Sequence, residues 1–545
     1  MSAWGQNGSA RSCDGLLKRV EANDPALKEL VILPLKTFGS KEVIRLAQCL
    51  RATSTKGRKN THLVSLQASG HAIDDPSALE ALGAALSSSS TCPTNTSRSI
   101  NETGNDVFLE EIAIGDSSMG DEGVSALCRG LGEGTDLALK RVDLSWKGIG
   151  SDGLYAILRV LGNQKSLESL NLARNEKIGP FFDFLSVPSI PSASPLFPNL
   201  KHLDFSECQL NAKSCASLLR ALSTATASVP EEDTRLNDAF IQTPPRGLAL
   251  KLNSNDLSDA LHTKDMMEVV LCGPLIEELH MSGCLLGDEG LRGIVDLCYN
   301  GTDSLQENDH GKRHSNKLRL LDLSNNNLTS ESLNYFATQL LASSASCNRP
   351  IFSGICQLNL SGNTLDEEFC RSFATCIEQG PLLSLKELDV SRTRCSVAGA
   401  VALLSCNADT KDGDTSHSSM KVLNLFGNQL RSEGFVEMSK VLQGGHSKLE
   451  SLDLGGNEAT EAGVVALLNA ISSETMDEKR NSLCLLTVGG NQGGASVEAV
   501  IKEIKRVHPK LDIARDKPLR QNNSSSRAFG NMNLPVQAPG TSWMG

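Results

Sequence analysis

Apolar residues recur along this chain at a fixed spacing, most regular between Leu318 and Leu328. In that stretch the periodic leucines stand at positions 318, 321, 323 and 328, and Asn326 precedes the last of them. The alternation around Leu321 and Leu323 predicts a short strand, and the polar residues after it predict a turn. The same spacing returns in order in segments that begin at Leu63, Leu109, Leu139, Leu167, Leu200, Gly247, Ile276, Leu318, Ile355, Leu385, Met420, Leu449 and Leu483, with a degenerate opening unit at Leu27, Leu30 and Ile32 and a closing strand at Leu511 and Ile513.

A helical pattern follows each predicted turn. It is clearest in residues 120–131, where Val124, Leu127 and Leu131 form one apolar stripe. Asp121, Asp288 and Ser432 stand at the beginnings of such patterns and are predicted to cap the helices that they open. Each unit is therefore predicted to be a strand, a turn and a helix.

The pattern L-x-x-L-x-L-x-x-N-x-L is the signature of leucine-rich repeats. The shortest intervals, such as Leu139 to Leu167, span about 28 residues, which leaves room for a full helix in each unit. The chain therefore resembles the ribonuclease-inhibitor-like class of leucine-rich repeat proteins over roughly Pro25 to Ala514. The resemblance implies an α/β solenoid, a horseshoe with a parallel β-sheet on its concave face and α-helices on its convex face.

The predicted organisation is one repeat domain between two tails. Residues 1–14 are expected to be a flexible N-terminal tail, residues 15–515 a leucine-rich repeat domain of about 14 repeats, and residues 516–545 a disordered C-terminal tail. Polar insertions interrupt the domain between a helix and the next strand, at Ser87–Asp106, Ser186–Pro198, Ser223–Arg246, Gly301–Asn316, Asn407–Ser418 and Ser473–Asn481. They are predicted to emerge on one edge of the horseshoe, either as tolerated insertions or as a contact rim.

Charge and composition argue against several classes of function. A formal net charge of −12 and a pI near 5.4 argue against a nucleic-acid partner, which would need clustered Lys and Arg. The sequence predicts neither a leader peptide nor a membrane span, so we expect the protein in the cytoplasm or the nucleus. The sixteen cysteines form no C-x-x-C pair and are expected to be reduced thiols in the core.

Side chains between the strand leucines are predicted to face the concave wall. The candidate protein-binding residues on this wall are Arg141, Asp143, Asn171, His202, Asp204, Lys251, Glu278, His280, Asp322, Asn359, Asp389, Asn424 and Asp453. Most are carboxylates or amides, and two interpretations stay open. Leu-Asp-Leu-Ser is a common sequence in such repeats, which would explain these residues without a partner. A wall of this kind would also accept hydrogen bonds from a basic partner.

The signature asparagine is predicted to bridge the backbones of successive turns. It is present as Asn175, Asn255, Asn326, Asn363, Asn428, Asn457 and Asn491, whereas Cys208, Cys284 and Thr393 take its place in three other repeats. Ribonuclease-inhibitor-like arrays also alternate Asn with Cys at this position, so the resemblance implies that the two cysteines are structural.

The arrangement that most resembles an enzyme site is His202, Asp204 and Glu207 with Lys251, Glu278 and His280. However, His202 and His280 lie two strands apart, about 9–10 Å at the backbone, whereas zinc needs each ligand atom within about 2.3 Å. No nucleotide-binding, metalloprotease, hydrolase or kinase motif occurs in the sequence. We therefore expect no catalytic residues, no metal and no cofactor.

Three functions remain as hypotheses. The first is a non-catalytic scaffold that binds a protein partner on the concave face. The second is a regulator of a small GTPase, because the array resembles Ran GTPase-activating proteins; those usually carry an acidic stretch after the repeats, whereas Leu511–Arg520 is basic-leaning. The third is an actin regulator, because Leu16–Leu30 resembles the opening of tropomodulin-type repeat domains. An immune-sensor hypothesis has less support, since no nucleotide-binding module precedes the repeats.

Overall fold

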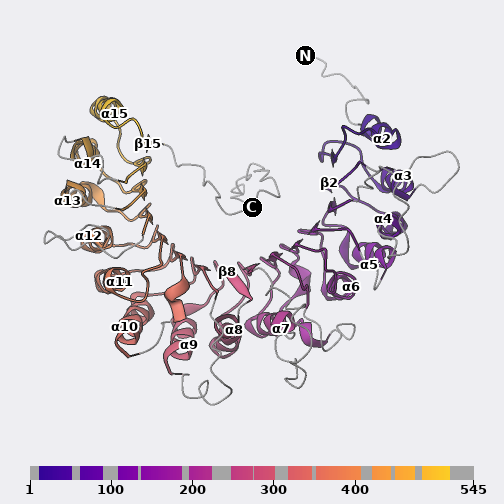
Figure 1. Ribbon diagram of the computed structural model, residues 1–545, viewed down its shortest axis with the longest axis horizontal. Coiled ribbons are helices and arrows are strands. Elements are labelled where there is room, and N and C mark those ends of the chain that lie inside the picture. The colour runs from indigo at the N-terminus through magenta and orange to yellow at the C-terminus, as the bar shows by residue number, and fades with distance from the viewer. Residues whose placement is uncertain are drawn as a thin grey trace, which may run out of the picture.

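The repeats stack into one curved solenoid with its strands inside and its helices outside (Figure 1). The computed structural model describes residues 12–51, 60, 62–89, 109–132, 137–186, 196–223, 247–273, 275–300, 317–346, 351–406, 420–443, 448–472 and 482–515. Within them a 15-stranded parallel sheet runs in chain order from β1 to β15. The predicted α/β leucine-rich repeat horseshoe is confirmed.

Most strands are three residues long. They are β1 (Glu29–Val31), β2 (Ser65–Ser69), β3 (Glu111–Gly115), β4 (Arg141–Asp143), β5 (Ser169–Asn171), β6 (His202–Asp204), β7 (Leu248–Lys251), β8 (Ile276–His280), β9 (Leu320–Asp322), β10 (Gln357–Asn359), β11 (Glu387–Asp389), β12 (Val422–Asn424), β13 (Ser451–Asp453), β14 (Leu485–Thr487) and β15 (Asp512–Ala514).

The helices cover the opposite face. They are α2 (Asp14–Glu21), α3 (Ser40–Arg51), α4 (Pro76–Ser89), α5 (Gly120–Leu131), α6 (Ser151–Leu161), α7 (Ala212–Ser223), α8 (Ala260–Cys272), α9 (Gly287–Asn300), α10 (Ser330–Ser346), α11 (Glu367–Gln379), α12 (Val397–Ser405), α13 (Arg431–Gln443), α14 (Glu461–Ser472) and α15 (Ala495–Val507), with short 3-10 helices η1 (Glu176–Ile178), η2 (Phe184–Ser186) and η5 (Ile351–Gly354). Because strands lie about 4.8 Å apart and helices about 8–10 Å apart, the stack curves toward its strands.

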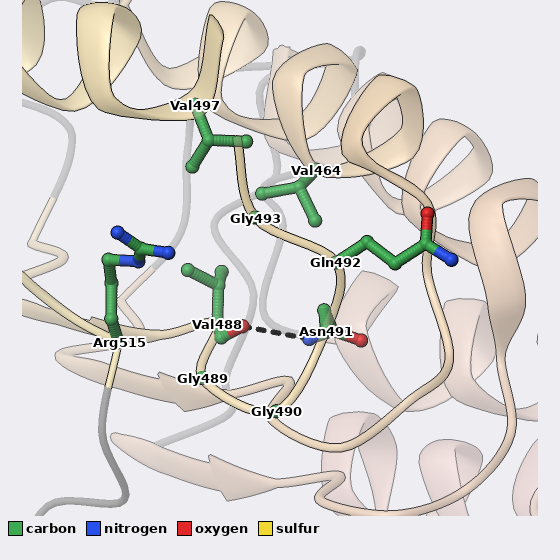
Figure 2. A pocket seen from close by; sticks show the side chains of 9 residues that line it. All are labelled: Val464, Val488, Gly489, Gly490, Asn491, Gln492, Gly493, Val497 and Arg515. Atoms are coloured by element: carbon green, nitrogen blue, oxygen red, sulfur yellow. Dashed lines mark hydrogen bonds between the residues drawn. The ribbon is translucent and has the colours of Figure 1, made fainter. Parts of the chain in front are cut away.

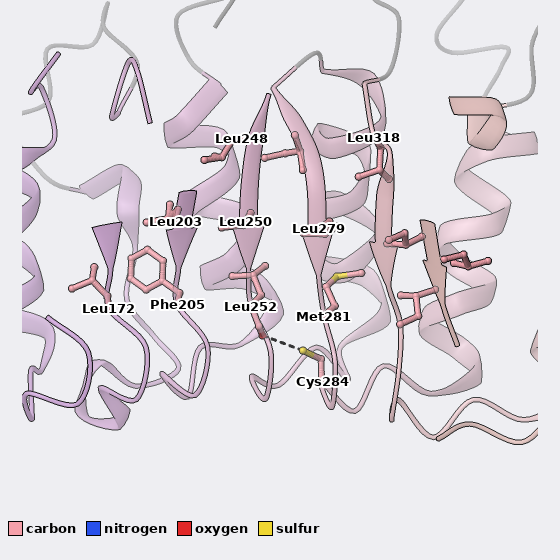
Figure 3. Close-up of a cluster of buried hydrophobic side chains, with 14 of the residues drawn as sticks. Leu172, Leu203, Phe205, Leu248, Leu250, Leu252, Leu279, Met281, Cys284 and Leu318 are labelled. Carbon is pink, nitrogen blue, oxygen red and sulfur yellow. Dashed lines mark hydrogen bonds between the residues drawn. The ribbon is translucent and has the colours of Figure 1, made fainter. Parts of the chain in front are cut away.

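The core is a stack of apolar layers between the sheet and the helices (Figure 3). The middle residues of consecutive strands are in register, as in Leu203, Leu250 and Leu279, and each is at most 1% exposed. Every repeat thus buries the same leucine position against its neighbours. Full burial of one such side chain contributes about 1.5–3 kcal/mol, so stability accumulates along the array.

A buried polar ladder joins the turns, as predicted from the signature asparagine. The Asn363 Oδ1 atom accepts from the amides of Asn326 and Leu328 in the preceding repeat, and its Nδ2 atom donates to the carbonyls of Leu323 and Leu360. The same pattern holds at Asn175, Asn255, Asn326, Asn428, Asn457 and Asn491. These amides satisfy backbone groups that the stack would otherwise leave buried and unpaired.

Cysteine and threonine partly replace this amide. Cys208 and Cys284 donate from Sγ to the carbonyls of Leu172 and Leu252, at 3.2 and 3.1 Å, and the second contact is drawn in Figure 3. Thr393 donates to the carbonyl of Val390 instead. Both cysteines are buried free thiols, in agreement with the structural role implied by the resemblance.

One repeat departs from the predicted strand, turn and helix. Between β5 and β6 the described residues form only η1 and η2, and none of them lies in an α-helix. Phe184 fills the layer instead: it is fully buried and packs edge-to-face on Phe205, with ring centroids 5.4 Å apart.

The predicted helix caps were assigned to the wrong helices. Asp121 does not cap α5; its Oδ1 atom accepts from the amides of Gly150 and Gly153, where α6 of the next repeat begins. Asp288 and Ser432 likewise accept from the backbone just before α10 and α14. Capping across the repeats therefore links α5 to α6, α9 to α10 and α13 to α14, whereas α8, α11 and α12 are capped by Asp259, Asp366 and Ser396 directly before them.

The predicted N-terminal tail of residues 1–14 ends earlier than expected. Ser12 forms a bridge with Thr37, Cys13 is 3% exposed, and Asp14 begins α2. Residues 1–11 and the C-terminal segment 516–545 lie outside the described residues, as do almost all of the predicted insertions. The expected disorder of the tails and the shared edge of the insertions stay predictions.

Candidate functional site

The strand register gathers the predicted site residues into two parallel rows on the concave wall. The first, which we call the Asp/Asn row, contains Asp143, Asn171, Asp204, Lys251, His280, Asp322, Asn359, Asp389, Asn424 and Asp453, one on each strand from β4 to β13. The second, the upstream row, lies two residues earlier on each strand and includes Arg141, His202 and Glu278. The geometry expected from the alternation is therefore present.

Carboxylates dominate these two rows over the full sheet. The wall carries Glu29, Glu111, Asp143, Asp204, Glu278, Asp322, Glu387, Asp389, Asp453 and Asp512 against Arg141 and Lys251. Arg141 is itself paired with Glu111 on the neighbouring strand. The concave wall is thus strongly acidic, and its negative charge has few internal counterions.

Most members of the Asp/Asn row also close the turn that follows their strand. The Oδ1 atom of Asp322 accepts from the Ser324 amide at 3.0 Å, and Asn359 accepts from Ser361 at the same distance. Equivalent bonds occur at Asp143, Asn171, Asp204, Asp389, Asn424 and Asp453. This is a local side-chain turn, so the recurrence of Asp and Asn has a structural cause.

Lys251 and His280 break the row at the centre of the wall. Lysine has no acceptor atom, so it cannot close the turn as Asp and Asn do. His280 lies between two carboxylates: its Nε2 atom is 3.8 Å from Glu278 Oε2, and its Nδ1 atom is 3.9 Å from Asp322 Oδ2. His202 lies on the upstream row nearby. These side chains form the central cluster, defined as His202, Lys251, Glu278, His280 and Asp322.

The pKa values of the two histidines of the central cluster are shifted in opposite directions. Burial alone would lower the pKa of His280, but the carboxylates of Asp322 and Glu278 outweigh it and leave the pKa raised. Burial lowers the pKa of His202, and the nearby Lys251 adds to this effect. The pKa of Glu278 is lowered chiefly by its contact with His280. The surroundings thus favour the protonated form of His280 and the neutral form of His202.

The contacts around His280 are long. The ion-pair distances of 3.8 and 3.9 Å around His280 exceed those of direct hydrogen bonds. Within the described ranges, no group of three or more His, Cys, Asp or Glu side chains is placed to hold a metal ion. The cluster presents charged and polar groups on a fixed β-scaffold.

A third row runs along the edge of the wall and was not predicted from the sequence. It consists of the turn residues whose backbone is left-handed, and whose amide donates to the next repeat. This turn row contains Gly70, Trp146, Arg174, Glu207, Ser254, Gly283, Asn325, Gly362, Arg392, Gly427 and Gly456. The recurrence of glycine three positions after a strand was the available signal, because glycine adopts this conformation without strain.

One cavity, of about 280 Å³, lies beside the last repeats between β14, β15 and the start of α15 (Figure 2). Val464, Val488 and Val497 line it, and the Arg515 side chain stands at its side. Its cause is Gly493, which occupies the last apolar position of the repeat signature. Other repeats bury a leucine there, as in Leu430 at 1% exposure. The cavity is therefore a missing side chain in the stack.

Comparison with known proteins supports the repeat assignment. Models of the leucine-rich repeat match residues 274–295 and 317–338. RAN GTPase-activating protein 2 of Arabidopsis thaliana is 29% identical over 132 residues, which span 24% of this chain and 22% of that protein.

Solved structures give similar matches over a larger part of the chain. A leucine-rich repeat protein of Leptospira interrogans covers 92% of this chain and 99% of its own, at 15% identity and a TM-score of 0.39. An internalin of Listeria monocytogenes covers 92% and 89%, at 13% identity and a TM-score of 0.34.

Hydropathy adds one further observation. None of the helices in the described part of the chain is both long enough and apolar enough to cross a bilayer. The matched repeat models, the repeated signature and the parallel array of strands and helices agree with one another. The chain is a leucine-rich repeat protein.

Proposed function

We propose that this protein is a non-catalytic scaffold that binds a basic protein partner on its concave wall. The observation that supports the proposal is the wall's charge, ten carboxylates against two cations on the two rows described above. Such a surface attracts cationic partners and repels nucleic acid. The central cluster, in the middle of the wall, supplies the most varied set of side chains for recognition.

The turn-closing role of the Asp/Asn row does not account for this charge. Asn171, Asn359 and Asn424 form the same turn bond with a neutral amide. A carboxylate at the other positions is therefore not required by the turn. At Asp143 and Asp204 the turn bonds occupy only the Oδ1 atom, so the second oxygen can face a partner, which is the basis of the proposal.

The chain itself supplies the matched substitution that tests this function. A variant with Asp143, Asp204, Asp322, Asp389 and Asp453 all changed to Asn keeps every turn bond and removes five of the ten carboxylates of the two rows. The control removes equal charge from exposed helix positions, through Glu122→Gln, Asp152→Asn, Glu289→Gln, Glu368→Gln and Glu433→Gln. Both variants are expected to fold as the natural chain does.

The measurement is proximity labelling in the native cell, followed by binding of each purified neighbour to the three proteins. We expect a basic neighbour whose affinity falls at least about tenfold with the wall variant and stays unchanged with the helix variant. If every neighbour binds the wall variant and the natural chain equally, the concave wall is not the interface.

A second candidate function is regulation of a small GTPase. The similarity to RAN GTPase-activating protein 2 favours it, although the match spans only 22% of that protein. A single-turnover assay with GTP-loaded Ran would show faster hydrolysis in the presence of this protein. Unchanged hydrolysis with Ran and with other small GTPases would exclude this function.

A further inference from the structure

Trp146 is held in a conformation that its own side chain disfavours. It belongs to the turn row and has a φ of 57°. Five other repeats place glycine at this position, and five place a polar or charged residue there, so Trp146 is the one large aromatic among the described members of the row. A left-handed backbone costs a residue with a Cβ atom about 1–2 kcal/mol relative to ordinary conformations. The indole is nevertheless 61% exposed, so little packing inside the protein offsets this strain.

The turn itself does not need a tryptophan. The amide of Trp146 donates to the Ala173 carbonyl at 2.8 Å, and the Gly283 amide makes the equivalent bond to Ser324. Any residue other than proline supplies that amide. An exposed large aromatic at a strained position therefore points to a contact outside the chain.

Carboxylates flank the tryptophan. Asp143 ends β4, three residues earlier in the chain, and Asp116 lies in the adjoining turn, since Ala113 on β3 is in register with Asp143. Asp143 uses its Oδ1 atom for the Ser145 amide and hydroxyl. Asp116 likewise uses Oδ1 for Ser118. Each therefore has a second carboxylate oxygen to offer.

The nearest cation is buried. Lys147 is 3% exposed, and its Nζ atom lies 3.3 Å from the Ser69 hydroxyl on β2. Its charge interacts with both Asp116 and Asp143 and offsets part of their charge, but it is not presented at the surface. Arg174, next in the turn row, is paired with Glu207 at 3.2 Å. In the described part of the chain, no cation–π contact is formed by the indole of Trp146 itself.

We infer that Trp146, Asp116 and Asp143 form a binding site for an arginine side chain of a protein partner, with the guanidinium stacked on the indole and paired with the carboxylates. Arginine fits because its planar cation stacks on aromatic faces and donates several hydrogen bonds. The inference rests on the proposed function, a basic partner at the acidic wall. It adds a specific contact point at the edge of that wall.

The test uses two fluorescein-labelled peptides, one alternating glycine with arginine and one alternating glycine with citrulline, the neutral isostere. Their affinities are measured by anisotropy for the natural chain, Trp146→Gly and Trp146→Phe. Glycine stands at this position in five of the other repeats, so Trp146→Gly is expected to keep the fold, with an unchanged or higher Tm. We expect Trp146→Gly to lower the affinity for the arginine peptide about fivefold and to leave the affinity for the citrulline peptide unchanged. Trp146→Phe should recover part of the lost affinity.

The wall variant used in this test changes Asp204, Asp322, Asp389 and Asp453 to Asn and keeps Asp143, so that it separates this inference from the proposed function. Trp146→Gly changes no charge, so its effect cannot come from the field of the wall. If arginine-peptide affinity falls only in the wall variant, the wall attracts cations but the tryptophan site is overturned. If it falls only in Trp146→Gly, the site holds without the proposed wall. Equal affinity for arginine and citrulline peptides would also overturn the site.

Discussion

Replacement of Asn363 by alanine tests the polar ladder most directly. The Asn363 side chain is 4% exposed and makes four backbone hydrogen bonds, with Asn326 and Leu328 as donors at 3.0 and 3.1 Å and Leu323 and Leu360 as acceptors at 2.9 Å. Alanine leaves all four backbone groups without a partner, away from water. At about 1–3 kcal/mol for each group, the free energy of unfolding should fall by about 4 kcal/mol or more.

Asn359→Ala in the same repeat is the matched control. Asn359 is half-buried on the concave wall, and its Oδ1 atom accepts from the Ser361 amide at 3.0 Å. Its loss should lower the free energy of unfolding by about 1 kcal/mol. The two variants remove the same side chain only four residues apart, so composition and helix propensity cancel in the comparison.

Urea unfolding monitored by circular dichroism measures both losses. Hydrogen exchange should accompany it, because repeat arrays open locally as well as globally. In Asn363→Ala the amides of Asn326 and Leu328 should exchange faster, whereas distant repeats stay protected. Equal losses in the two variants, or unchanged exchange at those two amides, would refute the assignment of Asn363 as an inter-repeat bridge.

Two further predictions concern packing and pH. Gly493→Leu should raise the free energy of unfolding by about 2 kcal/mol, because it places apolar atoms in the cavity. It displaces the end of the Arg515 side chain, which lies against the position of the new Cβ atom and is ion-paired with Glu498 in an exposed contact worth little. Gly490→Ala, at a φ of +74°, should lower the free energy of unfolding, and thermal unfolding checks both variants. His280 has a raised pKa in the folded protein, so its stabilising contribution is complete below the unfolded pKa of about 6.5 and is lost as the pH rises through the folded pKa. His280→Asn should therefore destabilise the protein more at pH 5.5 than at pH 8, and an equal loss at both pH values would contradict the ion-pair contacts.

The sequence predicted the features that depend on local periodicity. Alternation of apolar and polar residues was enough to place Asp322 and Asn359 on the wall and Leu321 in the core, because side-chain direction in a strand follows from position alone. The turn row escaped prediction because it depends on backbone angles. Trp146 looks like any other turn residue until its φ of 57° is known.

Features that depend on the neighbouring repeat were also missed. Asp121 stands where a helix cap belongs, but the stack brings it to the amides of the next helix, at Gly150 and Gly153. The balance that raises the pKa of His280 requires knowing that Asp322 lies on the adjacent strand. Spacing within one repeat carries no information on such contacts between repeats.

An array of repeats supplies its own reference for deciding which residues carry function. Most positions are set by the stack, so an asparagine that bridges two turns needs no further explanation. Departures from the shared pattern are more informative, and they differ in kind. Gly493 removes a side chain and leaves a cavity beside Arg515. Lys251 and His280 replace turn-closing residues with other ionisable groups, and Trp146 places an exposed indole at a left-handed turn position. The last three lie on or beside the same acidic wall. Since departures with a structural cost coincide with the surface of greatest charge, the wall and its adjoining edge are the place where a partner should be sought first.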